Sequence, residues 1–215
     1  MMKNSNPLTL AFWTGGLATL ATFFLSAGAQ NAPIATPANA NVETAIFAGG
    51  CFWCVESDFD KVDGVLETVS GYIGGRTDNP TYYSHGEDGH FEAVRVVYDS
   101  SKVEYGELVD YFLRHIDPTD DGGQFCDRGN SYRTAVFVEN QTEREEVEAQ
   151  FSAIQRSGAL PAPIVTQILD ETAFYEAEAF HQNYYQKNPI RYRVYRAGCK
   201  RDQTVARIWS GAGNS

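Results

Sequence analysis

The hydrophobic positions of this chain follow two periods, one typical of α-helices and one typical of β-strands. Between Phe52 and Val62 the apolar residues lie three or four positions apart, which predicts a helix. Between Val65 and Ile73 apolar and polar residues alternate before a Gly-Gly pair, which predicts a half-buried strand. Short apolar or Val-rich runs predict further strands at 44–48, 91–98, 134–138 and 164–169. Further helices are predicted at 105–115, 141–156 and 174–185.

These elements are interspersed along the chain but do not alternate regularly. The Gly- and Asp-rich stretch 119–131 predicts a long loop, and the chain from Ile190 onward predicts an irregular tail with one helical turn near 205–208. Such an order favours an α+β fold over a doubly wound one. We therefore predict a two-layer α/β sandwich with a mixed, ferredoxin-like sheet and an irregular C-terminal tail.

The N-terminal segment has the features of an export signal. Lys3 precedes a largely apolar run at 8–25, and a small-x-small motif ends the segment 1–29, as signal peptidases require. The apolar run also approaches the roughly 20 residues that span a bilayer, so an uncleaved membrane anchor is the alternative. Residues 30–41 predict a flexible linker because they lack charge and apolar bulk. The folded domain is then 42–215, and we expect it to be periplasmic or otherwise extracytoplasmic.

Length and charge narrow the possible partners. The chain has 215 residues and a formal net charge of −11. One domain fits this length, and we expect it to be a monomer. Because phosphate binding requires clustered Lys and Arg, we expect no nucleic-acid partner.

The exported part contains four cysteines, Cys51, Cys54, Cys126 and Cys199. In an oxidising compartment they could form two structural disulfides, as in a binding domain without enzymatic activity. Cys51 instead follows a Gly-Gly turn at a helix start, where the positive end of the helix would lower its pKa and make it reactive. The pair Cys51-Phe52-Trp53-Cys54 would also suit a thioredoxin-like disulfide oxidoreductase.

Several motifs in fixed order point to one family. The segment Gly50-Cys51-Phe52-Trp53, with Glu56 three residues later, resembles the signature of the A-type peptide methionine sulfoxide reductases, which act on the S epimer of the sulfoxide. Further blocks that resemble the family lie at 70–75, 79–82, 89–94, 115–118, 127–133 and 179–184. The resemblance spans about 43–199.

The resemblance implies a role for each matching residue. Cys51 attacks the sulfoxide sulfur, and Glu92 protonates the leaving oxygen, which requires surroundings that raise its pKa. Tyr82 and Tyr132 hydrogen-bond that oxygen. The other implied groups are Phe52, Trp53 and Asp127 in the substrate pocket, and Glu56, His90 and His181 as supporting residues. No cofactor is implied, and the four histidines lack the spacing of metal ligands.

A second thiol must then resolve the sulfenic acid that forms on Cys51. Cys199 matches the family's usual resolving position, and Cys126 is the next candidate. Cys54, which replaces the usual Gly of the signature, is the third. The resemblance implies that a thioredoxin-like reductant restores the thiols by exchange.

Overall fold

The computed structural model describes residues 41–211. The predicted signal peptide, the predicted linker apart from its last residue, and residues 212–215 lie outside this range. No helix within 41–211 is both long enough and apolar enough to cross a membrane.

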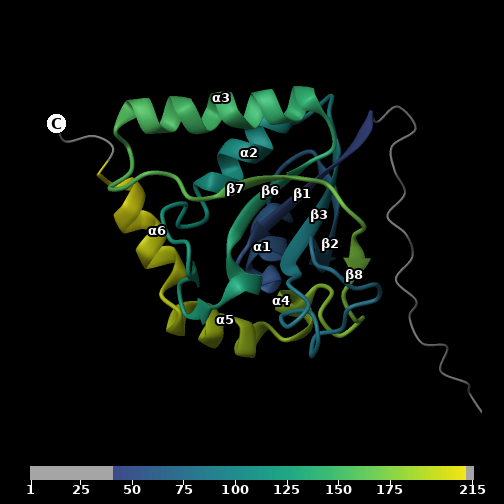
Figure 1. Cartoon of the computed structure of the whole chain (residues 1–215). Helices are drawn as coiled ribbons and strands as arrows, with labels where there is room; N and C mark the ends of the chain where they lie inside the picture. Colours follow the sequence, from purple (N-terminus) through teal and green to yellow (C-terminus); the bar gives the residue numbers. More distant parts are fainter. Residues whose placement is uncertain (1–40, 212–215) are drawn as a thin grey trace, which may run out of the picture. The chain divides into compact units, whose positions relative to one another are not determined.

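A six-stranded sheet forms the centre of the domain (Figure 1). Its order is β7-β6-β1-β3-β2-β8, in which β6 and β7 are parallel and all other neighbours are antiparallel. The strands are β1 (Val42–Gly49), β2 (Val65–Ile73), β3 (Phe91–Asp99), β6 (Thr134–Val138), β7 (Gln167–Asp170) and β8 (Tyr175–Glu176). The inner order β6-β1-β3-β2, with helices after β1 and β3, is the ferredoxin-like arrangement. The predicted α+β sandwich with a mixed sheet is therefore confirmed.

Helices α1 (Phe52–Phe59), α2 (Tyr105–Leu113) and α3 (Gln141–Ser157) form the second layer. In β1 the side chains of Ala45 and Phe47 point into the core beneath this layer, whereas Ile46 and Ala48 belong to a smaller cluster on the other face. This alternation is the period of two expected of a strand. Asn140 caps α3 by accepting a hydrogen bond from the Glu143 amide, and a left-handed Gly158 ends it.

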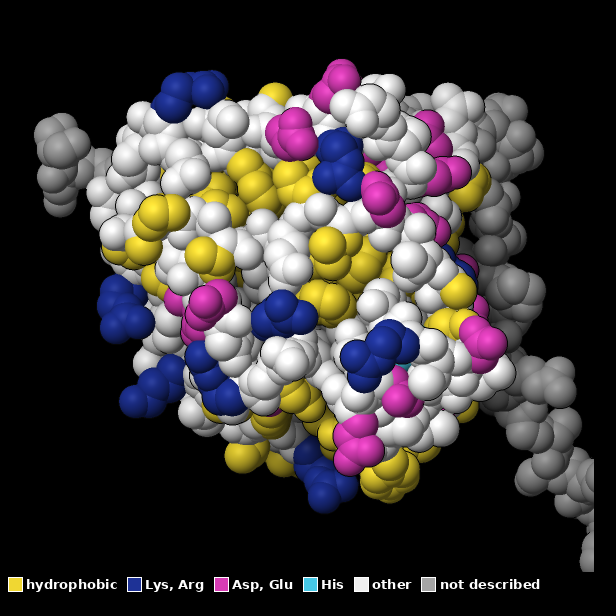
Figure 2. Space-filling model, viewed as in Figure 1, with side chains coloured by type: hydrophobic (Ala, Val, Ile, Leu, Met, Phe, Trp, Pro, Cys, Tyr) yellow, Lys and Arg dark blue, Asp and Glu magenta, His cyan; other side chains and the backbone are white. Residues whose placement is uncertain are grey.

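The remaining elements lie either in the loop between α2 and β6 or after β8, the last strand of the sheet. They are β4 (Gly123–Gln124), β5 (Asp127–Arg128), the 3-10 helix η1 (Asn130–Tyr132), α4 (Tyr184–Lys187), α5 (Pro189–Gly198) and α6 (Arg201–Trp209). Figure 2 shows apolar side chains gathered in the upper and central part of the face that it displays, with charged side chains of both signs around them.

The predicted helix at 174–185 is wrong. Tyr175 and Glu176 form β8 on the edge of β2, and the chain then turns until α4 begins. The Gln182 side chain accepts a hydrogen bond from the Ser70 amide and donates one to the Ser70 carbonyl. Tertiary hydrogen bonds to a strand edge therefore replace the bonds that a helix would make internally.

The predicted irregular tail is also wrong, because α5 and α6 occupy most of it. Tyr192 is the only residue of α5 that is fully buried, so the helix has too few apolar positions to show a period. Pro189 at its first turn was a usable start signal. The predicted turn at 205–208 lies within α6.

The domain is tightly packed around Gly50, the residue that directly follows β1. Gly50 has φ +83°, and a Cβ added to it would lie 2.5 Å from the Cβ of Gln124, whose amide is fixed by Asp117. Gly89 also has φ +83° but has open space around it. We expect Gly89→Ala to lower the free energy of unfolding by about 1–2 kcal/mol, and Gly50→Ala by about 1–3 kcal/mol more. Urea denaturation measures both, and equal losses would contradict this packing.

Candidate active site

The turn between β1 and α1 places Cys51 in the interior. Cys51 is the N-cap residue of α1, and only 6% of its surface is exposed. Within α1 every side chain except that of Trp53 is buried. Cys51 therefore lies at the buried end of a buried helix, rather than at an exposed turn.

Glu92 on β3 is the buried carboxyl group next to this helix start. Its Oε2 accepts a hydrogen bond of 3.1 Å from the Phe52 amide, and the residue is 1% exposed. Burial raises the pKa of Glu92 to about 8, although the Phe52 amide and the Tyr132 hydroxyl oppose this by stabilising the carboxylate. Glu92 therefore keeps its proton at neutral pH, and the surroundings expected for it are present.

Two tyrosine hydroxyls lie near the same carboxyl group. Burial raises the pKa of Tyr82 and Tyr132, and charge on Glu92 or Cys51 raises each further. Both residues border a hollow of about 360 Å³, and both remain hydrogen-bond donors at neutral pH. The Tyr82 amide is held by a 3.0 Å hydrogen bond to Glu178.

Aromatic rings form the other wall of the site. Trp53 stacks on Tyr184 with 3.7 Å between ring centroids, and its indole N–H donates to His181 Nδ1 at 3.0 Å. Phe52 packs against Tyr72 and His181 inside the core. The structure thus brings Phe52, Trp53 and His181 together as predicted from the motifs, while their roles toward a substrate stay predictions.

The four cysteines divide into two pairs. Cys126 and Cys199 form a disulfide, and Cys51 and Cys54 are free and buried. The two-disulfide alternative is therefore wrong for this structure. The sulfurs of Cys126 and Cys199 lie near an Asp127 carboxylate oxygen in the manner of a metal site, but sulfurs joined in a disulfide are not thiolate ligands.

The lowered pKa predicted for Cys51 is wrong. Burial raises the pKa of the Cys51 thiol, and its hydrogen bond with Cys54 raises it further. The Phe52 amide, which could have stabilised a thiolate at the helix start, donates to Glu92 instead. The same hydrogen bond between the thiols lowers the pKa of Cys54 to about 7, despite its burial.

The predicted supporting residues have different positions. Glu56 accepts a hydrogen bond from the Asn183 amide, and burial raises its pKa to about 7, so it fixes the start of α4. His90 accepts from the Gly75 amide, and its other ring nitrogen contacts the Thr77 carbonyl. His90 therefore holds the turn after β2 and does not contact the site.

Asp127 lies at the rim of the site, where the Tyr195 hydroxyl donates a 2.5 Å hydrogen bond to it. Burial raises the pKa of Asp127, and this bond opposes the rise. Tyr195 also interacts with Cys51, so it connects the rim to the nucleophile.

Sequence reasoning missed several residues that complete the site: His85, Glu178, Tyr195, Arg196 and Arg201. His85 is buried, with Nδ1 bonded to the Tyr82 carbonyl at 2.8 Å and Nε2 facing Glu92 at 3.8 Å. In the sequence, the only indication that His85 belongs to the site is that it lies three residues after Tyr82. The other four lie in segments whose structure was predicted wrongly, so no pattern placed them.

A buried thiol beside a protonated carboxyl group and two tyrosine hydroxyls defines a thiol-based enzyme that can attack one atom and protonate its neighbour. The model of the family "Peptide methionine sulfoxide reductase" matches residues 43–212. The chain therefore belongs to this family and is an oxidoreductase. This result excludes the thioredoxin-like alternative.

Individual relatives agree with the family match. "Peptide methionine sulfoxide reductase MsrA 2" of Rhizobium meliloti is 51% identical over 170 residues, which cover 79% of this chain and 85% of the relative. MsrA of Bacillus subtilis is 46% identical over 169 residues, covering 78% and 96%. Among solved structures, methionine sulfoxide reductase A of Corynebacterium diphtheriae has a TM-score of 0.61 at 36% identity, covering 69% of this chain and 76% of that one. Reduced Mxr1 of Saccharomyces cerevisiae has a TM-score of 0.62 at 30% identity, covering 69% and 86%.

The protonation of Glu92 can be measured without a substrate. We expect infrared difference spectra to show a protonated carboxyl group that titrates near pH 8 because of burial, and Glu92→Gln to remove this signal. Glu148→Gln, at an exposed position of α3, is the matched control and should leave the signal unchanged. A signal that titrates near pH 4.5, the ordinary value, would contradict the assignment.

Proposed function

We propose that this protein reduces the S epimer of methionine sulfoxide, free or within proteins, to methionine. The observation that carries the proposal is the protonated Glu92 carboxyl group bonded to the amide next to Cys51. A sulfoxide oxygen must take up a proton to leave, and a carboxyl group with a raised pKa supplies one at neutral pH. Repair of oxidised proteins would follow from this activity.

In the proposed reaction Cys51 attacks the sulfoxide sulfur while Glu92 protonates the oxygen. The hydroxyl groups of Tyr82 and Tyr132 stabilise the charge that develops on this oxygen, because both still carry their protons. Phe52 and Trp53 supply the apolar wall for the methyl group. The oxygen is transferred to Cys51, and methionine leaves.

For the next step we rank Cys54 ahead of Cys199 and Cys126. Cys54 is the free thiol that hydrogen-bonds Cys51, whereas the other two are joined to each other. Its thiol condenses with the Cys51 sulfenic acid to form an S–S bond and water. A thioredoxin-like reductant, whose two thiols supply the electrons, then reduces this disulfide by exchange.

Reduction of the separated S and R sulfoxides of a blocked methionine, with dithiothreitol as electron source, tests the proposal. We expect turnover of the S epimer only, none in Cys51→Ser, and a loss of about 10²–10⁴-fold in Glu92→Gln, the usual contribution of a general acid. Glu148→Gln again serves as the control. Turnover of neither epimer by the wild-type protein would overturn the proposal.

We also infer that the protein is exported and cleaved after Ala29. The apolar run at 8–25 supports this, as does the disulfide, because such bonds persist in oxidising compartments. Sequencing the N terminus of the mature protein should give Gln30 as its first residue. A protein that retains residues 1–29 in the membrane would support the anchor instead.

A further inference from the structure

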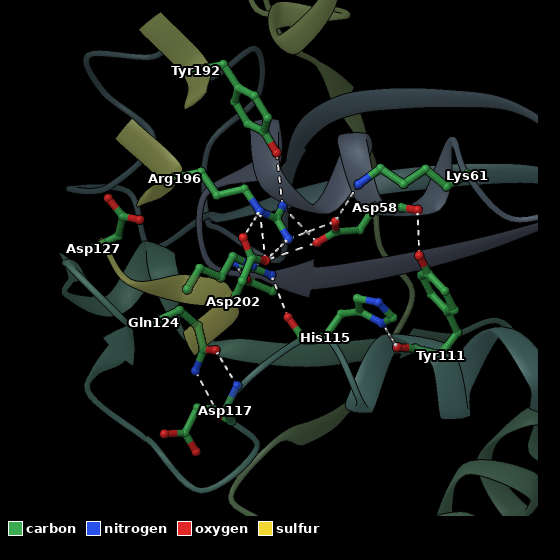
Figure 3. Close-up of polar contacts among 12 residues, drawn as sticks. Asp58, Lys61, Tyr111, His115, Asp117, Gln124, Asp127, Tyr192, Arg196 and Asp202 are labelled. Carbon is green, nitrogen blue, oxygen red and sulfur yellow. Dashed lines mark hydrogen bonds and ion pairs between the residues drawn. The ribbon is translucent and has the colours of Figure 1, made fainter. Parts of the chain in front are cut away.

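Two arginines from the C-terminal helices meet beneath α1. Arg201, at the start of α6, is 2% exposed and donates to the carbonyls of Gly49 at 3.1 Å and His115 at 3.0 Å. Arg196, near the end of α5, donates to Asp58 at 3.1 Å and to Asp202 at 2.6 Å (Figure 3). Arg201 therefore holds the turn that carries Cys51, and Arg196 holds the last turn of α1 through Asp58.

The charges in this cluster do not balance inside the protein. Asp58 is the buried carboxylate, while the side chain of Asp202 is 68% exposed. Arg201 Nε has no hydrogen-bond partner and lies 3.8 Å from Asp58 Oδ2. Two guanidinium groups therefore share one buried carboxylate. A buried cation is stable only when a nearby anion compensates it, so the cluster favours another negative charge close by.

Cys54 is the group placed to carry that charge. It is 2% exposed and lies one helical turn before Asp58, so the two side chains share a face of α1. Arg201 and Arg196 both favour its ionised form, whereas Asp58 opposes it. The hydrogen bond from the Cys51 thiol also favours a thiolate at Cys54.

The other titratable groups that influence Cys54 are neutral at pH 7. They are Cys51 on α1, Glu92 on β3, and Tyr192 and Tyr195 on α5. Burial raises the pKa of each of them, which favours the protonated form. Of the groups described around the cluster, Cys54 is thus the one that can become its missing anion.

We propose that Arg196 and Arg201 hold Cys54 as a thiolate, and that this thiolate accepts the proton of Cys51 as Cys51 attacks the sulfoxide. This inference rests on the proposed function. Arg196 and Arg201 are positioning residues, because they act through Cys54. In this proposal the C-terminal helices α5 and α6 serve to place the two arginines close to Cys54.

The atoms and electrons of this sequence balance. In the first step the sulfoxide oxygen passes to the Cys51 sulfur and takes the Glu92 proton, while the Cys51 proton passes to Cys54. The sulfoxide is reduced to the thioether, and the Cys51 sulfur is oxidised to the sulfenic acid. In the second step the Cys54 sulfur attacks the Cys51 sulfur, the S–S bond forms, the S–O bond breaks, and the hydroxyl leaves as water with the Cys54 proton. Solvent then returns a proton to Glu92.

The rate of methionine formation in a single turnover, measured against pH, tests this role. In the wild-type protein we expect the rate to rise with a midpoint near 7, as Cys54 ionises, and to fall above about 8, as Glu92 loses its proton. The midpoint of the rise is the quantity that the variants test. Arg201→Gln should move the midpoint up by about one pH unit, so that the rate below it falls about tenfold. Arg201→Lys keeps the positive charge, so its midpoint should lie close to the wild-type value. Arg207→Gln, at an exposed position of α6, should leave it in place.

A second variant and a direct titration keep the test decisive. If Arg201→Gln does not fold, Arg196→Gln removes the other charge and should shift the midpoint in the same direction. In Cys51→Ser, where Cys54 is the only free thiol, ultraviolet absorbance should report a thiolate that the same arginine changes weaken. Unchanged midpoints in folded Arg201→Gln and Arg196→Gln would overturn the arginine role. Methionine formation at the wild-type rate by Cys54→Ser would overturn the base role.

Failure of the proposed function has a different signature. If the wild-type protein forms no methionine from either epimer, the reductase assignment fails. The titration of Cys51→Ser does not depend on a substrate, so it still decides whether Cys54 carries the charge. A thiolate that is insensitive to both arginine changes overturns this inference whatever the activity.

Discussion

The hydrogen bond between the Phe52 amide and the Glu92 carboxyl group is the contact on which the rest of the site depends. It joins the first residue of α1 to the central strand β3, whose register with both neighbours is fixed. Because both partners are buried, losing either would leave a polar group without a partner. The nucleophile and the acid are therefore held together by the same bond that positions the helix on the sheet.

The segment that carries Glu178, Gln182 and Asn183 is held in place by polar contacts and not by an apolar helix face. Gln182 pairs with the edge of β2, and Glu178 binds both the Tyr82 amide and the Tyr72 hydroxyl. Asn183 adopts a left-handed conformation, and Glu56 satisfies its amide. These bonds fix an irregular segment against α1, so the aromatic wall around Trp53 depends on hydrogen bonds made far away in the sequence.

This division explains what the sequence could predict. The strands β2 and β6 were predicted with their observed bounds, because short runs of apolar and β-branched residues between turn residues mark buried strands. Family motifs pointed to Cys51 and Glu92. The predicted pKa of Cys51 was wrong because the burial of the start of α1 is a tertiary property that the motif does not show. Arg201 could not be found, because a single arginine in a polar helix has no pattern until the fold places it beneath Gly49.

Burial acts on Glu92 and Cys54 alike, so their different protonation must come from their neighbours. Around Glu92 the stabilising groups are one amide and one hydroxyl, which do not offset desolvation, and its pKa rises to about 8. Around Cys54 a thiol donor and two guanidinium groups outweigh it, and its pKa falls to about 7. Between pH 7 and pH 8, Glu92 therefore keeps its proton while Cys54, next to the nucleophile Cys51, carries a negative charge. That state would be lost on the acidic side through Cys54 and on the alkaline side through Glu92. The two helices that supply the arginines therefore set the acidic limit of this pH range, and the burial of Glu92 sets the alkaline limit.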